Sequence, residues 1–420
     1  MAALGCAGGG SQSVPPPVIE RFQPDNAQVE MGSEVLLEAV FSNGKGVVDH
    51  EGGALFGSGV VRVTPMTNTI YTLTVTNGHG ESVRRQATVV VNPGLAVTVE
   101  GHEGVAGEVT VTGPGGFRRT MVASGLLTGL EPGDYTIEAA PARRGGLTLH
   151  PWQPIQELAV QSGTAVKVKY PAPFLSVLLP GRVPLDFVLI PAGRFVMGND
   201  HPADPRRSPS PSPAHPVTIR RAFYFAKTPT TVAQWEAIAG AARPTVAAPD
   251  EAVGGVSFES IKATYLPELN RRLPGHSFRL PSEAEWEYAC RAGTTTAYFH
   301  GPDAARVWDY AWSIGAYQAD PHPVGKRLPN PWGLYDLTGL VFQWCEDLAH
   351  DGYMGAPQDS GPWLEPWPNV MEGQRILRGF PPMGVPGENL SGSSADRHSF
   401  GELEPGEYLG FRLVASEERH

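Results

Sequence analysis

Apolar and polar residues alternate over the first part of the chain with the period of two that is typical of β-strands. The clearest runs place apolar side chains at Val35, Leu37, Ala39 and Phe41, and then at Tyr71, Leu73 and Val75. The Asn77-Gly78 pair follows the second run, and such pairs favour the positive φ angles of a tight hairpin. These patterns predict an all-β sandwich over residues 18–93.

A second β-rich segment follows, over residues 94–178. Glycine and proline interrupt its alternation at Gly113–Gly116 and at Leu130–Asp134, where we predict turns. Tyr135, Ile137 and Ala139 then share one face of a strand. This segment is predicted to form a second small sandwich.

The stretch Tyr170–Pro184 contains four prolines, which predicts a stiff, non-helical connection to the last domain. That domain, predicted over residues 179–420, mixes strands with helices. Thr231 and Gln234 have the spacing of a helix capping box, and so do Ser282 and Glu285. After the second box, one helix face presents only Trp286, Ala289 and Cys290, so we expect this face in the core.

Composition favours a soluble multidomain chain and argues against nucleic acid as a partner. The chain has 420 residues, 41% hydrophobic content and a formal net charge of −11. No block of basic residues offers the clustered positive face that phosphate binding needs. There is also no uninterrupted apolar run long enough for a membrane-spanning helix.

The segment Met1–Ser13, within a predicted leader of residues 1–17, resembles the end of a bacterial lipoprotein signal and its flexible tether. Cys6 would be the acylated residue. This predicts a location in the bacterial cell envelope or periplasm, with membrane contact only through the lipid. The alternative is a short leader without that role.

Four separated segments carry a resemblance that runs from about Phe187 to Val414, and two short runs close it. The four are Phe187–Gly198, the helix predicted from Thr231 to Gly240, Arg279–Gly293 and His322–Trp344, and the closing runs are Arg375–Gly379 and Leu409–Leu413. In this order they resemble the formylglycine-generating-enzyme, or sulfatase-modifying-factor, family. The resemblance implies an irregular α+β domain related to the C-type lectin fold. The two β segments before it resemble immunoglobulin-like and carboxypeptidase-regulatory-like modules.

The founding enzymes of that family use two thiols to hold copper(I) and to oxidise a substrate cysteine, chemistry that suits sulfur ligands. The resemblance places both thiols shortly after Arg378-Gly379. This chain has no cysteine after Cys345, and the single thioether of Met383 cannot replace two thiolates. We therefore expect copper-dependent formylglycine generation to be lost.

Calcium is the second cofactor that the resemblance implies, bound by a Gly-Asn-Val-Trp-Glu-Trp loop. The corresponding Gly339–Trp344 has Leu340 in place of Asn and Gln343 in place of Glu. These changes remove two oxygen donors and one charge, and calcium prefers six or more oxygens. The site is expected to be degraded, although backbone carbonyls would still allow weak coordination.

Other candidate chemistries are weaker. His79-Gly80-Glu81 has the spacing of iron ligands but lies beside the predicted hairpin, where polar residues are expected anyway. Cys290 and Cys345 are interpreted as inert small hydrophobes, with one disulfide open to them in an oxidising compartment. Glu283 and Glu287 share a helix face and are interpreted as solvated or capping residues.

These observations predict a non-catalytic binding or scaffold protein with a protein or glycan ligand. Its recognition surface would be Phe380–Leu403. The binding residues expected to line it are Trp344, Arg378, Asp396 and Arg397. The alternative for Arg378 and Arg397 is that they tie loops together. The alternative function is a metal-dependent oxidoreductase, for which the candidate ligands are His322, His350 and His398.

Overall fold

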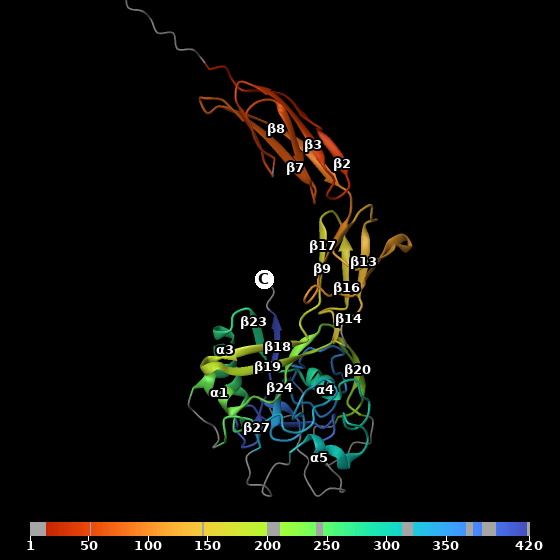
Figure 1. The fold of residues 1–420 in the computed structure, drawn as a ribbon, viewed down its shortest axis with the longest axis vertical. Helices are drawn as coiled ribbons and strands as arrows, with labels where there is room; N and C mark the ends of the chain where they lie inside the picture. The colour runs from red at the N-terminus through yellow and green to blue at the C-terminus, as the bar shows by residue number, and fades with distance from the viewer. Residues whose placement is uncertain are drawn as a thin grey trace, which may run out of the picture. The chain divides into compact units, whose positions relative to one another are not determined.

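The computed structural model describes residues 14–50, 52–144, 147–199, 211–240, 247–312, 322–366, 373–379 and 392–417 (Figure 1). The chain forms two compact units. The first comprises Met1–Glu100, Ala106–Ala139 and Ile155–Val168, and the second comprises Gly101–Val105, Ala140–Pro154 and Lys169–His420. Within the described ranges, no helix has the length and apolar character needed to cross a membrane.

The N-terminal part of the first unit is a β-sandwich, as predicted. One sheet has the order β1 (Val18–Gln23), β3 (Val35–Ser42), β6 (Gly59–Val63). The other has the order β2 (Asn26–Val29), β8 (Ser82–Val91), β7 (Thr69–Thr76), β4 (Lys45–Val48), β5 (Gly53–Leu55). Alternate side chains of β3 and β7 are buried between the sheets, because successive residues of a strand face opposite sides.

The predicted hairpin is present, but the tight turn predicted at Asn77-Gly78 is wrong. Thr76 pairs with Ser82, so five residues connect β7 to β8, and the positive φ falls at Gly80 (86°). The Asn77 side-chain oxygen accepts the backbone N–H groups of His79 and Glu81 at 3.0 Å each. The amide side chain therefore closes the loop and makes a wider connection stable.

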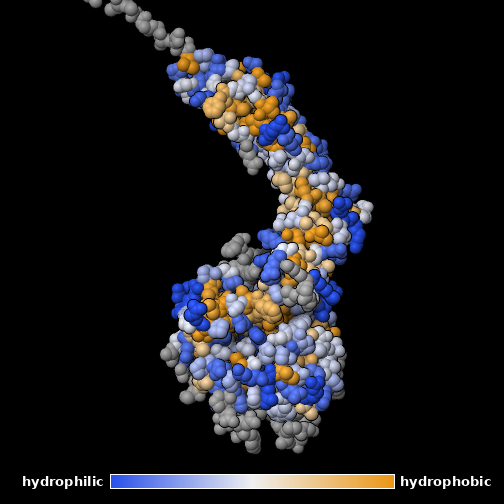
Figure 2. Space-filling model, in the orientation of Figure 1, coloured by the Kyte–Doolittle hydropathy of each residue, from blue (hydrophilic) through white to orange (hydrophobic). Residues whose placement is uncertain are grey.

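A second sandwich follows in the first unit, again as predicted. One sheet has the order β11 (Arg118–Met121), β10 (Val109–Thr112), β13 (Gly133–Ala139), β16 (Ile155–Val160). The other has the order β12 (Gly125–Leu127), β9 (Leu95–Glu100), β17 (Thr164–Lys169). Tyr135 and Ile137 are buried. Figure 2 shows apolar residues interspersed with polar ones on the visible face of this unit.

The described residues of the second unit form three sheets besides the β14 (Ala142–Arg144) and β15 (Leu147–Leu149) ribbon. The largest has the order β18 (Phe174–Leu179), β19 (Val183–Ile190), β22 (Phe223–Ala226), β28 (Val414–Glu417), β23 (His276–Arg279). The second has the order β26 (His398–Gly401), β25 (Gln374–Arg378), β24 (Phe342–Leu348), β27 (Leu409–Gly410). The third is a pair, β20 (Gly193–Met197) with β21 (His215–Ile219). The stretch predicted as a connection thus contains a paired strand, β18, because its Leu175 and Val177 pack on the core.

The helices are short: α1 (Val232–Ala239), α2 (Phe258–Ser260), α3 (Leu266–Arg272), α4 (Glu283–Arg291) and α5 (Val307–Tyr310). Both predicted capping boxes are present, at Thr231 with Gln234 and at Ser282 with Glu285. Every residue of α4 is buried, because the helix contacts β20, β24 and β25 inside the domain (Figure 1).

Candidate functional site

The carboxylates of Glu283 and Glu287 lie one turn apart on α4 and are 3% and 0% exposed. The interpretation of these residues as solvated or capping groups is therefore wrong. Arg397 binds Glu283 through Nε to Oε1 and Nη2 to Oε2, both at 2.8 Å. Its remaining nitrogen donates to the His350 carbonyl at 3.0 Å. A bidentate contact of this kind fixes both side chains.

Glu287 is held by two further arginines. Arg378 donates to its Oε2 and Arg291 donates to its Oε1 at 2.8 Å. The Gly198 N–H also donates to Oε1, at 2.8 Å. Arg378 in turn donates to the carbonyls of residues 394, 395 and 396, so it ties the C-terminal loop to α4. This agrees with the alternative interpretation of the arginines as loop ties.

This paired network controls the charge of Glu283. Burial alone would raise the pKa of its carboxyl, but the neighbouring Arg397 and Arg378 charges outweigh burial and lower it. Glu283 therefore stays ionised deep in the domain, and removing a partner would leave a charge buried without compensation.

The other two predicted binding residues are also buried. Trp344 is 0% exposed and donates its indole N–H to the Val256 carbonyl at 2.9 Å, so it is a core residue and not an aromatic platform. Asp396 accepts the backbone N–H groups of Gly392 and Ser393, which closes its own turn. Residues 380–391 of the predicted recognition surface, with Met383, lie outside the described residues, as does Cys6.

The three candidate histidines have separate surroundings. His350 stacks on Trp363 with ring centroids 3.5 Å apart, and each of its ring nitrogens lies 2.8 Å from a backbone carbonyl oxygen. His322 stacks on Trp312, and His398 packs edge-on against Phe342. Among the residues that the structure describes, no three His, Cys, Asp or Glu side chains are grouped to hold a metal ion.

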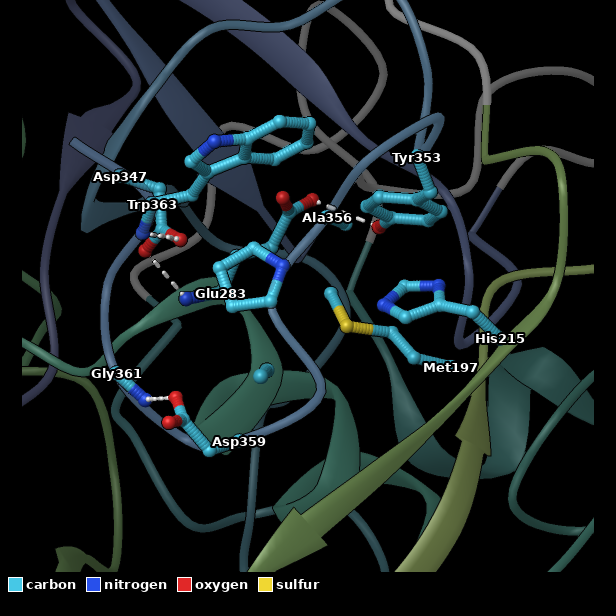
Figure 3. A pocket seen from close by; sticks show the side chains of 11 residues that line it. Met197, His215, Glu283, Asp347, Tyr353, Ala356, Asp359, Gly361 and Trp363 are labelled. Carbon is cyan, nitrogen blue, oxygen red and sulfur yellow. Dashed lines mark hydrogen bonds between the residues drawn. The ribbon is translucent and has the colours of Figure 1, made fainter. Parts of the chain in front are cut away.

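A small pocket of about 20 Å³ lies beside Glu283. Eleven residues line it (Figure 3): Met197, His215, Glu283, Ala284, Asp347, Tyr353, Ala356, Pro357, Asp359, Gly361 and Trp363. Sequence reasoning missed this pocket, because its walls come from β20, β21, α4, β24 and a loop far apart in the chain. No local signal singles out His215 or Asp347.

Hydrogen bonds hold the acidic side of the pocket in place, as Figure 3 shows. Asp347 accepts the backbone N–H of Glu283 at 2.7 Å and that of Trp363 at 2.8 Å. The Tyr353 hydroxyl donates to Glu283 Oε1 at 3.0 Å, and the Tyr353 ring packs against His215 with centroids 4.8 Å apart. Oδ2 of Asp347 thus accepts an N–H at the N-terminus of α4, and Oδ1 ties the Trp363 backbone to the same carboxylate.

Burial shapes the charges in this pocket. It raises the pKa of Asp347 to about 7, and the adjacent Glu283 charge adds to that shift. Burial also lowers the pKa of His215, which favours the neutral imidazole. At neutral pH Glu283 is therefore a carboxylate, and Asp347 is near its midpoint.

The Gly339–Trp344 loop does not fit a calcium ion coordinated by Gln343. The Gln343 oxygen accepts the indole N–H of Trp286 at 2.8 Å and Nε of Arg412 at 3.1 Å. Its amide nitrogen donates to the Asp336 carbonyl, and Arg412 donates to the same carbonyl at 3.0 Å. A buried guanidinium already places a positive charge at these oxygens, and a second cation there would be repelled.

The two described cysteines offer no nucleophile. Cys290 and Cys345 are unpaired and both 0% exposed, as expected of small core residues. Burial raises the pKa of the Cys290 thiol to about 11 and also raises that of Cys345. Because the thiolate is the reactive form, both thiols are inert at neutral pH.

Sequence comparisons show which known proteins this chain resembles in part. Over 103 residues the chain is 37% identical to the serine/threonine-protein kinase pkn1 of Chlamydia caviae, a match that covers 24% of this chain and 15% of the kinase. Over 81 residues it is 35% identical to the formylglycine-generating enzyme of Mus musculus, covering 16% of this chain and 22% of that enzyme. The matches thus span less than a quarter of either relative.

Among solved structures, PvdO from Pseudomonas aeruginosa is 27% identical with a TM-score of 0.47, covering 59% of this chain and 99% of PvdO. The titin Ig tandem domains A164-A165 are 9% identical with a TM-score of 0.17, covering 36% of this chain and 97% of that structure. The model of the sulfatase-modifying factor enzyme 1-like domain matches residues 181–417, more than half of the chain, and the protein therefore belongs to this family.

Proposed function

We propose that this protein is a non-catalytic binding protein of the bacterial cell envelope, whose sulfatase-modifying-factor-like domain binds a ligand. The observation that carries the proposal is the pocket beside α4. Its wall is fixed in advance, because Glu283 is held by Arg397 and Tyr353, and Asp347 by two backbone N–H groups. A preformed, concave and partly aromatic site is typical of binding.

The state of the thiols supports a role without thiol chemistry. Copper(I) oxidation of a substrate cysteine needs accessible sulfur ligands. Cys290 and Cys345 are both buried, and burial raises the pKa of each thiol. No cysteine follows Cys345 in the sequence.

The proposed location follows from the N-terminal sequence. In this view Cys6 carries a lipid, and the two β-sandwiches act as spacers between the lipid and the binding domain. Labelling of cells with a radioactive or alkyne-tagged fatty acid tests this. The label should enter the wild-type protein and be absent from Cys6→Ser.

The binding role is tested with the purified full chain on arrays of envelope glycans and envelope-protein peptides. Asp359 is exposed and lines the pocket, and Asp250 is an exposed aspartate that does not line it. We expect Asp359→Lys to lose the bound signals and Asp250→Lys to keep them. Equal signals from both variants would exclude the pocket as the site.

Catalysis is tested in parallel. A thiol-bearing peptide incubated with the full chain and copper should yield no aldehyde, and formation of the aldehyde would overturn the proposal. Metal analysis addresses the oxidoreductase alternative. Stoichiometric iron or copper that is lost in His322→Ala, His350→Ala or His398→Ala would favour it.

A further inference from the structure

The pocket beside α4 collects acidic groups without basic ones. Glu283, Asp347 and Asp359 are among its eleven lining residues, and none of those eleven is a lysine or arginine. Arg397, which binds Glu283, is not among the lining residues and is already paired with that carboxylate. An anionic ligand would meet repulsion here, and a cationic one attraction.

Asp347 is a buried carboxylate that lacks a cationic partner among the described residues. Its two oxygens accept one backbone N–H each, and the structure's described residues place no guanidinium or ammonium within ion-pair distance of them. Burial and the Glu283 charge raise its pKa to about 7, which shows that its ionised form is poorly compensated. A cation entering the pocket would supply that compensation.

Aromatic rings and one unused nitrogen complete the lining. The Trp363 indole forms one wall and is backed by the stacked ring of His350. Indole faces attract ammonium and guanidinium groups. Nδ1 of His215 is buried and has no hydrogen-bond partner among the described residues, and the lowered pKa of His215 leaves the ring neutral. Such a nitrogen can accept a hydrogen bond from a ligand N–H.

The pocket is small, about 20 Å³, so only the charged end of a side chain can enter it. We propose that the pocket binds the positively charged end of a lysine or arginine side chain on a protein partner. This inference depends on the proposed binding function and narrows it, because neutral glycans lack such a cation.

The test uses the full chain with three blocked amino acids as probes at low salt. They are the acetylated methylamides of lysine, of arginine and of uncharged norleucine, which has nearly the shape of lysine without its charge. Titration calorimetry or tryptophan fluorescence should detect binding of the lysine or arginine probe. The norleucine probe should bind at least about tenfold more weakly, since the charge supplies the affinity.

Matched variants locate the binding. We expect Asp347→Asn to weaken the cationic probe about tenfold and exposed Asp359→Lys to weaken it at least fivefold, whereas Asp250→Asn leaves it unchanged. Circular dichroism shows whether each variant is folded. If Asp347→Asn does not fold, the affinity of Asp359→Lys for the cationic probe is the test of the inference. Affinity should also rise as pH increases through about 7, when Asp347 ionises beside Glu283, Asp359, His215 and Tyr353.

The failures can be told apart. Equal binding of norleucine and lysine probes, or equal binding by Asp359→Lys and Asp250→Asn, would overturn the cation inference. If ligands on the arrays still bind and Asp359→Lys abolishes that binding, the proposed binding function remains, but its ligand belongs to another chemical class. Binding to glycans and not to peptides would be such a result. Aldehyde formation or a stoichiometric redox metal would instead overturn the binding function itself.

Discussion

Arg397 binds Glu283 through two parallel hydrogen bonds of 2.8 Å, although 114 residues separate them in the chain. Both residues are 3% exposed. Because this contact joins the loop before β26 to the first turn of α4, it holds one wall of the pocket in a single geometry. The pair thus connects the stability of the domain to the shape of the candidate site.

Breaking this pair should destabilise the domain strongly. Arg397→Met leaves the Glu283 charge buried, with Arg378 3.6 Å away as its remaining cation, and we expect a loss of about 3–5 kcal/mol. The double variant Glu283→Met with Arg397→Met removes both charges and should lose less than the two single variants summed. Urea unfolding followed by fluorescence measures each value, and strictly additive losses would contradict the pairing.

Gly198 should resist substitution for a steric reason. It has φ +83°, and a Cβ there would lie 2.4 Å from the Pro211 carbonyl oxygen and 2.9 Å from the Tyr353 ring. Gly240 has the same φ but open space around its Cβ position, which makes it the matched control. We expect Gly240→Ala to cost about 1–3 kcal/mol in unfolding free energy, from the backbone alone. Gly198→Ala should cost about 2 kcal/mol more or fail to fold, and equal costs would rule out the clash.

Asp347 should make stability depend on pH. Its folded pKa is about 7, and its unfolded pKa is about 3.9. Between these values only the folded state holds the proton, so the contribution of Asp347 to stability is full below about pH 4 and is lost as pH rises through 7. The slope reaches about 1.4 kcal/mol per pH unit for one proton.

The difference in unfolding free energy between wild type and Asp347→Asn isolates this effect, measured from about pH 4 to 8. Wild type should lose stability relative to the variant as pH rises. Glu283 acts in another window, because its lowered pKa makes its contribution disappear only as pH falls below about 4.5. A difference that stays constant with pH would show that Asp347 does not titrate there.

The core thiols should be unreactive in the folded protein. In a Cys6→Ser variant, an aromatic disulfide reagent at about pH 8 should label neither Cys290 nor Cys345, because both are buried and their pKa values are raised. Both should react once urea unfolds the chain. Rapid labelling of either thiol in the native protein would reopen thiol chemistry.

Local features followed from the sequence where neighbours along the chain supply the energy. The boxes at Thr231 and Ser282 cap their helices as predicted, because each bond joins residues three positions apart. The alternation in β3 and β7 placed the core of the first sandwich correctly. The Asn77 loop was misjudged, since one side-chain amide outweighed a general turn preference.

The candidate site could not be predicted from short-range pattern. Glu283 and Glu287 have the helical spacing of a solvated face, and only Arg378 and Arg397 from the far end of the chain explain their burial. Trp344 was expected at a surface, but β24 turns it into the core. The sequence by itself determined the strands, the caps and the family resemblance, because these depend on short-range pattern. Only the tertiary structure decided which charges meet around the pocket, because burial and pairing come from residues distant in the chain.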